Sequence, residues 1–166
     1  IASASSRVTQ SGFWQKLSAH PTYDAFWREQ AMDKILARQP VTVPTMLVHS
    51  LWDAEDIYGA IAVYKAIKPN DKNNDKVFLV MGPWSHGGGI GDGSKLGEVK
   101  FNSDTALHFR QEILRPFLDR YLKDAPGPAA DIAPVSAFET GTNKWRSLAS
   151  WPSGCNGCTI RPVPLR

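Results

Sequence analysis

The sequence predicts an α/β fold built around a parallel sheet, and three stretches carry this prediction. Two short apolar runs, Thr45–Ser50 and Lys76–Met81, flank the segment Ile57–Ile67, whose apolar residues recur at helical spacing. Two strands joined through a helix form a βαβ unit, in which the second strand lies parallel to the first in one sheet. Both strands then end at the same edge of the sheet, which is where open α/β sheets bind ligands.

Other helices are predicted on either side of this unit. Apolar residues at three- and four-residue steps predict one amphipathic helix over residues 21–38, and the first dozen residues resemble a loop or frayed end. After the second strand, the glycine-rich run Gly87–Gly97 predicts a mobile surface loop, and it matches no phosphate-binding pattern. A long helix is predicted over residues 104–123, with a kink at Pro116.

The C-terminal part of the chain predicts a different kind of structure. Residues 124–133 are rich in Pro, Ala and Gly and predict a linker. Beyond it, Val135–Glu139 and Lys144–Leu148 are predicted strands around a hairpin-like turn. We interpret residues 1–123 as the end of an α/β domain and residues 134–166 as the beginning of a separate β domain.

Composition excludes several classes of function. The chain of 166 residues is 42% hydrophobic and 21% charged, which is typical of a globular protein. Its 19 basic residues are scattered among 16 acidic ones, so no surface for nucleic acid or an anionic membrane is predicted. No apolar stretch approaches the roughly 20 residues that span a bilayer. Because the chain lacks a starting Met and a signal-peptide pattern, we expect it to be a piece of a longer polypeptide.

Two cysteines lie close together near the C-terminus, at Cys155 and Cys158. A zinc ribbon needs a second pair of cysteines, and a thioredoxin-like motif opens a helix after a strand; neither context is present. We therefore interpret the pair as a local disulfide or as two idle thiols.

Two candidate catalytic residues follow the ends of the predicted strands. Asp53 follows the first strand and His86 the second, so the fold can bring them together across one crevice. A carboxylate and an imidazole in this arrangement suggest an orienting group and a general base, although a loop histidine without function remains the alternative. Trp52 and Trp84 flank the pair and either wall a pocket or pack in the core. His49, inside the first strand, is expected to be a packing residue.

The residues around this pair resemble a known family. Leu51–Ala60 and Met81–Gly88 are similar to motifs of the α-amino acid ester hydrolases, serine enzymes of the wider cocaine esterase, glutaryl acylase and X-prolyl dipeptidyl peptidase group. The resemblance covers roughly residues 14–158. It also includes three shorter stretches: His20–Trp27, Leu114–Tyr121 and Thr140–Trp145.

The resemblance implies a fold, an activity and roles for particular residues. It implies the C-terminal part of an α/β-hydrolase domain, followed by the start of a jelly-roll β domain. Asp53 would be the acid of a Ser, Asp, His triad and His86 its general base, whereas Glu55 and Asp56 would bind the α-ammonium group of the substrate. The implied substrates are α-amino acid esters and amides, including β-lactam antibiotics. No metal or organic cofactor is implied, and the family forms homo-oligomers that are exported to the periplasm or secreted.

The sequence departs from this family at the nucleophile. The motif Gly-x-Ser-x-Gly does not occur in the chain, and Ser85 lacks that pattern, so we expect the chain alone to be inactive. Two alternatives stay open: another serine esterase, glutaryl acylase or X-prolyl peptidase, or a non-catalytic α/β binding domain. Glu55 could be merely solvated, and Asp56 could merely cap the helix. Calcium binding by these acids is a weaker alternative, because adjacent positions seldom supply a full oxygen shell.

Overall fold

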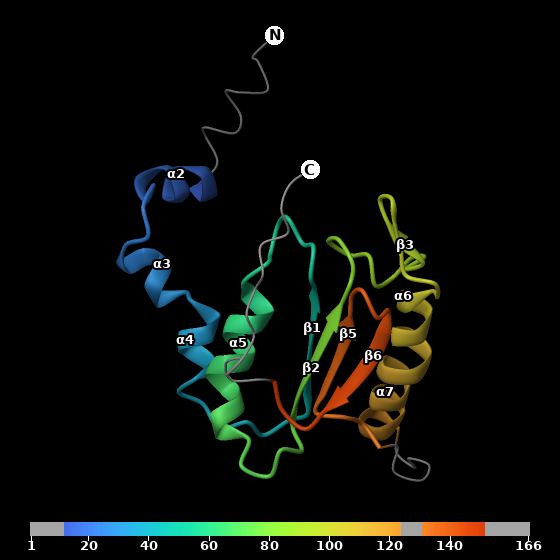
Figure 1. Cartoon of the computed structure of the whole chain (residues 1–166). Helices are drawn as coiled ribbons and strands as arrows, with labels where there is room; N and C mark the ends of the chain where they lie inside the picture. The colour runs from blue at the N-terminus through green and yellow to red at the C-terminus, as the bar shows by residue number, and fades with distance from the viewer. Residues whose placement is uncertain (1–11, 124–130, 152–166) are drawn as a thin grey trace, which may run out of the picture.

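A four-stranded sheet forms the centre of the computed structural model, which describes residues 12–123 and 131–151 (Figure 1). The strand order is β1-β2-β5-β6, and β2 runs parallel to both of its neighbours. The outer strand β6 runs antiparallel to β5. The strands are β1 (Thr45–Ser50), β2 (Val77–Gly82), β5 (Val135–Glu139) and β6 (Lys144–Leu148).

The predicted βαβ unit is confirmed. Helix α5 (Gly59–Ile67) and the short 3₁₀ turn η1 (Lys68–Asn70) connect β1 to β2. The parallel register runs from Thr45 opposite Val77 to Ser50 opposite Gly82, so both strands end at the same level. Whatever follows these two strands is therefore presented at one edge of the sheet.

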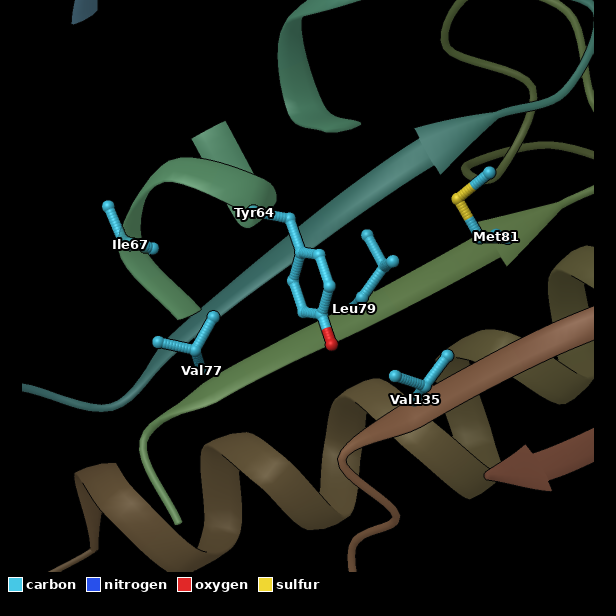
Figure 2. Close-up of a cluster of buried hydrophobic side chains, with 6 residues drawn as sticks. All are labelled: Tyr64, Ile67, Val77, Leu79, Met81 and Val135. Atoms are coloured by element: carbon cyan, nitrogen blue, oxygen red, sulfur yellow. The ribbon is translucent and has the colours of Figure 1, made fainter. Parts of the chain in front are cut away.

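Helices cover both faces of the sheet (Figure 1). Every residue of β2 is buried as a consequence. On one face, two side chains of α5 point toward alternate residues of β2 and the start of β5 (Figure 2). This cluster consists of Tyr64, Ile67, Val77, Leu79, Met81 and Val135. On the other face, Val80 packs with Trp84, Ala106 and Phe109. Each large apolar side chain buried in this way contributes roughly 1.5–3 kcal/mol.

The helical segment on the second face has an irregular middle. It comprises α6 (Thr105–His108), the π-helical turn η2 (Phe109–Leu114) and α7 (Arg115–Leu122). Asp104 caps its beginning by accepting hydrogen bonds from two backbone N–H groups. The predicted disturbance near Pro116 takes the form of this π turn, because proline has no N–H and its ring excludes the carbonyl four residues earlier.

The predicted single helix over residues 21–38 is wrong. The structure has two short helices, α3 (Ala25–Glu29) and α4 (Met32–Leu36), separated by an extended Ala31. The side-chain amide of Gln30 donates to the Phe26 carbonyl, which is the acceptor that the Gln30 backbone N–H would need to continue an α-helix. The structure also contains α2 (Gly12–Ala19), which the sequence analysis did not assign.

Both C-terminal strands were predicted at their observed bounds, but they are part of the central sheet. We expected a separate β domain from residue 134, but β5 pairs directly with β2 in the central sheet. Leu79 donates its backbone N–H to the Pro134 carbonyl, and Val135 is completely buried. Alternation along the sequence identifies a strand but not the sheet that it joins. Most of the predicted linker, residues 124–130, and the two cysteines lie outside the described residues.

The glycine-rich stretch after β2 also differs from a simple loop. Its last part enters a small antiparallel hairpin, β3 (Lys95–Leu96) and β4 (Val99–Lys100), with a turn at Gly97 that has a positive φ. In the parts of the chain that the structure describes, no helix is both long enough and apolar enough to cross a membrane.

Candidate active site

Backbone hydrogen bonds join the two turns that follow β1 and β2. Leu51 donates its N–H to the Gly82 carbonyl at 2.9 Å, and Trp52 donates to the Trp84 carbonyl at 3.0 Å. The parallel pairing of the strands thus continues beyond their ends. These bonds bring the next residue of the first turn, Asp53, beside the second turn.

Asp53 and His86 are in direct contact, as the sequence analysis expected. The imidazole Nδ1 lies 3.0 Å from Oδ2 and 3.2 Å from Oδ1 of Asp53. The aspartate side chain is 9% exposed, whereas that of His86 is 58% exposed. Oδ1 of Asp53 also accepts the backbone N–H groups of Glu55 at 2.8 Å and Asp56 at 3.0 Å. A buried carboxylate therefore holds an accessible imidazole.

Electrostatics favour an ionised Asp53 and a basic His86. The backbone N–H of Asp56 has the largest effect on Asp53, and with the Glu55 N–H and His86 it outweighs burial and lowers the pKa of the carboxyl group. The hydrogen bond to Asp53 raises the pKa of His86 above its ordinary value, and the charges of Asp53 and Glu55 add to this effect. Because Nδ1 donates to the carboxylate, Nε2 is the nitrogen left for proton transfer.

A cavity of about 400 Å³ opens beside this pair. Four of the predicted site residues line it: Asp53, Asp56, Trp84 and His86. Glu55 is not among the lining residues, but its Oε2 lies 3.8 Å from Nε2 of His86. Trp52 is 57% exposed, and it is not one of the described residues that line this cavity. The cavity thus brings four of the six predicted residues together, Glu55 lies beside His86 without lining it, and Trp52 does not line it.

Asp56 lines the cavity and also takes part in starting α5. Its Oδ1 accepts the Gly59 N–H at 2.7 Å, and a Cβ at Gly59 would overlap that carboxylate. The N-cap position of α5 is Tyr58, which has no side-chain cap, so Asp56 is not the N-cap, but it still accepts a hydrogen bond from the first residue of the helix. Asp56 therefore contacts the helix start and lines the cavity as well.

Trp84 presents an apolar wall to the cavity. It is buried, and its indole N–H donates to the Thr105 hydroxyl at 2.8 Å. A Cβ at Gly82 would overlap the indole ring, so the glycine before this turn is needed for the ring to pack there. Trp84 therefore lines the cavity and also packs in the core, which are the two roles that the sequence left open.

Several lining residues were not predicted from the sequence. Phe109 and Leu114 both reach the cavity from the two ends of η2, because a π turn aligns residues five apart. Pro116 in a helical pattern was the signal that such a turn was present. His49 is buried, as its predicted packing role requires, and it lines the cavity as well. Ile90 and two loop glycines had no signal in the sequence.

A metal site does not emerge from this geometry. Over residues 12–123 and 131–151, no group of three or more His, Cys, Asp or Glu side chains is placed to hold a metal ion. The arrangement at the cavity is instead suited to proton transfer by one imidazole beside carboxylates.

Comparison with known proteins identifies the family. The sequence profile of the X-Pro dipeptidyl-peptidase (S15) family matches residues 2–88, which is more than half of the chain. The chain belongs to this family. The S15 motif region thus contains β1, α5 and β2 together with both members of the Asp53–His86 pair.

Individual relatives agree with the S15 assignment. An α-amino acid ester hydrolase structure is 50% identical with a TM-score of 0.85, covering 91% of this chain and 24% of that one. An aminopeptidase structure from the marine sediment archaeon Thaumarchaeota archaeon is 50% identical with a TM-score of 0.82, covering 90% and 24%. The cocaine esterase of Rhodococcus sp. (strain MB1 Bresler) is 26% identical over 141 residues, or 80% of this chain and 22% of the esterase. The chain thus spans about a quarter of the length of these relatives.

Proposed function

We propose that this chain is the C-terminal part of the catalytic domain of a serine hydrolase that acts on α-amino acid esters and amides. The Asp53–His86 contact carries the proposal, because it engages Nδ1 and leaves Nε2 of a cavity-lining imidazole for proton transfer, with Glu55 3.8 Å from Nε2 and Asp56 in the same cavity lining. The substrate class extends to β-lactam antibiotics with an α-amino side chain. A jelly-roll β domain elsewhere in the full-length protein, homo-oligomeric assembly and export from the cell belong to the same proposal.

In the proposed reaction, His86 acts as the general base and then as the general acid. Nε2 removes the proton from a serine hydroxyl that another segment of the full-length protein supplies, and the serine oxygen forms a bond to the acyl carbon. The leaving alcohol or amine receives that proton from the imidazolium, and water releases the acyl group by the same steps in reverse. Asp53 keeps the proton on Nδ1 and stabilises the imidazolium.

Glu55 and Asp56 are the proposed recognition groups for the substrate ammonium. Asp56 lines the cavity and Glu55 lies beside His86, and these two carboxylates favour a cationic acyl donor over a neutral one. The names of the two structures that are 50% identical point in the same direction, since one is an α-amino acid ester hydrolase and the other an aminopeptidase. The more distant relative is named as an esterase of cocaine.

Substrate preference of the full-length enzyme tests the recognition part of this proposal. We expect kcat/KM to be higher for an α-amino ester than for the analogue without the amino group. Glu55→Gln and Asp56→Asn should each reduce this preference by roughly tenfold or more, since a hydrogen bond to a charged group contributes about 1.5–3 kcal/mol. Asp56→Asn keeps an oxygen for the Gly59 N–H, so that the helix start is preserved.

Glu98→Gln is the matched control, because this exposed glutamate lies between β3 and β4 and does not line the cavity. Equal rates with the amino and des-amino esters would reject α-amino recognition and favour a general esterase or acylase. Covalent labelling with a serine-reactive phosphonate tests the catalytic part: labelling that depends on His86 is expected. Failure to label would favour the non-catalytic binding domain.

A further inference from the structure

The loop that carries His86 is tied to the helical segment on the second face of the sheet. Nη1 of Arg110 lies 3.0 Å from the carbonyl oxygen of Gly89, 2.8 Å from that of Ile90 and 2.8 Å from that of Gly91. This nitrogen carries two N–H groups, so at least one hydrogen is shared between two of the three carbonyls. One guanidinium thus holds three consecutive residues of the loop.

Three further hydrogen bonds fix Trp84 and Gly93 at the two sides of these carbonyls. Thr105 accepts the Trp84 indole N–H at 2.8 Å and donates its hydroxyl to the Gly93 carbonyl at 2.7 Å. Asp104 accepts the Gly93 backbone N–H at 2.9 Å. The glycine-rich run Gly87–Gly97 was expected to be a mobile surface loop; in the structure it is held at Gly89–Gly91 and at Gly93, and Trp84 just before it is held as well.

His86 depends on this anchoring more than Asp53 does. Its side chain is 58% exposed, and the contacts found for it in the described residues are those with Asp53 and Glu55. Asp53 is buried, and its Oδ1 accepts two backbone N–H groups of its own turn. The position of the imidazole relative to the carboxylate is therefore set by the backbone of residues 83–93 rather than by packing of the ring.

We propose that Arg110 is a positioning residue for His86: its guanidinium binds the carbonyls of Gly89, Ile90 and Gly91 and thereby fixes the loop backbone that presents the imidazole to Asp53. Only the catalytic consequence of this role rests on the function proposed above. A planar guanidinium suits the task, because it presents several donors in a fixed geometry, whereas a lysine ammonium is a compact point charge on a flexible stem.

The experiment measures the pKa of His86 by NMR titration in the 166-residue chain. The charged groups that face this ring are Asp53, Glu55 and Asp56. Removing a nearby cation by itself raises the pKa of an imidazole, because a like charge is lost. Losing the contact with Asp53 lowers that pKa instead. The direction of the change therefore separates positioning from a simple charge effect.

We expect Arg110→Gln to lower the His86 pKa toward its ordinary value, and Arg110→Lys to lower it less. Arg115→Gln is the matched control on the same helical segment: this arginine is 75% exposed and its Nε lies 3.7 Å from Asp119, away from the loop. An unchanged or raised His86 pKa in Arg110→Gln would overturn the proposal. If that variant fails to fold, Arg110→Lys decides, and a wild-type titration in it would also overturn the proposal.

Kinetics of the full-length hydrolase provide the second measurement. A displaced general base lowers kcat more than it changes KM, and a misplacement of about 1 Å costs up to roughly 100-fold in rate. We expect Arg110→Gln to lower kcat by roughly 10- to 100-fold, and Arg115→Gln to leave it unchanged. If the full-length protein hydrolyses no ester, the proposed function fails, whereas the NMR titration still decides the role of Arg110.

Discussion

Two turns of the same βαβ unit are built around a buried aspartate, and they end in different chemistry. Asp53 follows β1 at the carboxyl edge of the sheet, and Asp71 precedes β2 at the opposite edge; both are 8% exposed. Each carboxylate accepts backbone N–H groups from the residues that follow it. The local structure is therefore the same: the aspartate carboxylate accepts hydrogen bonds from backbone N–H groups of its own turn.

The partner side chains make the difference. Lys68 places its ammonium 2.8 Å from Asp71, donates also to the Val77 carbonyl, and is 18% exposed. His86 is 58% exposed and opens onto a cavity. The Lys68–Asp71 ion pair joins the end of α5 to the start of β2, and we call this pair the staple. An imidazole exchanges its proton near neutrality, so the Asp53 turn can become a catalytic site.

The largest expected effect separates these two turns by activity. Asp53→Asn in the full-length hydrolase should lower kcat by roughly 10⁴-fold, because the amide favours the wrong tautomer of His86. Asp71→Asn should leave kcat of the folded enzyme close to wild type. Steady-state kinetics at saturating substrate measure both, and an equal loss in the two variants would remove the distinction between site and staple.

The free energy of unfolding, unlike kcat, should depend strongly on Asp71. Asp71→Asn leaves the Lys68 ammonium without its carboxylate, and breaking a buried pair in this way costs about 3 kcal/mol in the free energy of unfolding. The control Asp75→Asn removes a 54% exposed carboxylate from the same turn and should cost less than about 0.5 kcal/mol. Urea unfolding of the chain measures both values. A cost for Asp71→Asn as small as that of the control would mean that the staple contributes nothing.

Acid pH should act on the Asp71 turn within a defined window. Burial raises the pKa of Asp71, but the Lys68 ammonium and three backbone N–H groups outweigh it and lower the pKa to about 2. A depressed pKa stabilises the folded state above the unfolded value near 4, and this stability is lost as pH falls from about 4 to about 2. The loss should be on the order of 2 kcal/mol, and it should be absent in Asp71→Asn. Urea titrations between pH 2 and 5 measure this difference.

The smallest effect is expected at Glu55, which lies 3.8 Å from His86 and is 72% exposed. Because Glu55 helps to raise the pKa of His86, Glu55→Gln should lower that pKa slightly, and Asp53→Asn should lower it more. A neutral imidazole is the base, so the acid limb of kcat/KM should lie above pH 6.5 and move to lower pH in Glu55→Gln. A limb that moves to higher pH would contradict the attraction between these two groups.

His86 has the opposite linkage to folding from the two aspartates. Its raised pKa adds stability that is fully present below the unfolded value near 6.5 and is lost as pH rises through the folded pKa. The Asp71 turn should therefore lose stability toward acid pH, whereas the Asp53 turn should lose stability toward acid pH through Asp53 and toward alkaline pH through His86. NMR titration and unfolding measured on the same samples would sharpen this contrast.

The central sheet could be predicted in part from local pattern. The runs that became β1 and β2 are apolar and short, and the helical spacing between them allowed only a parallel connection. The strands β5 and β6 were equally clear, but their membership of the central sheet was not, since it depends on β2 having a free edge. The helix over residues 21–38 failed for a local reason, because the side chain of Gln30 competes for a backbone carbonyl.

The sequence by itself determined the βαβ unit, the positions of Asp53 and His86 at its two strand ends, and the resemblance that assigns them roles. The periodicity of apolar residues and the order of the motifs are properties of the sequence alone, so they can be recognised without the structure. Only the tertiary structure decided that the imidazole meets a buried carboxylate, that a π turn lines the cavity and that Arg110 anchors the loop. Those features depend on distances between segments far apart in the chain, which the packing of helices on the sheet sets and local sequence does not encode.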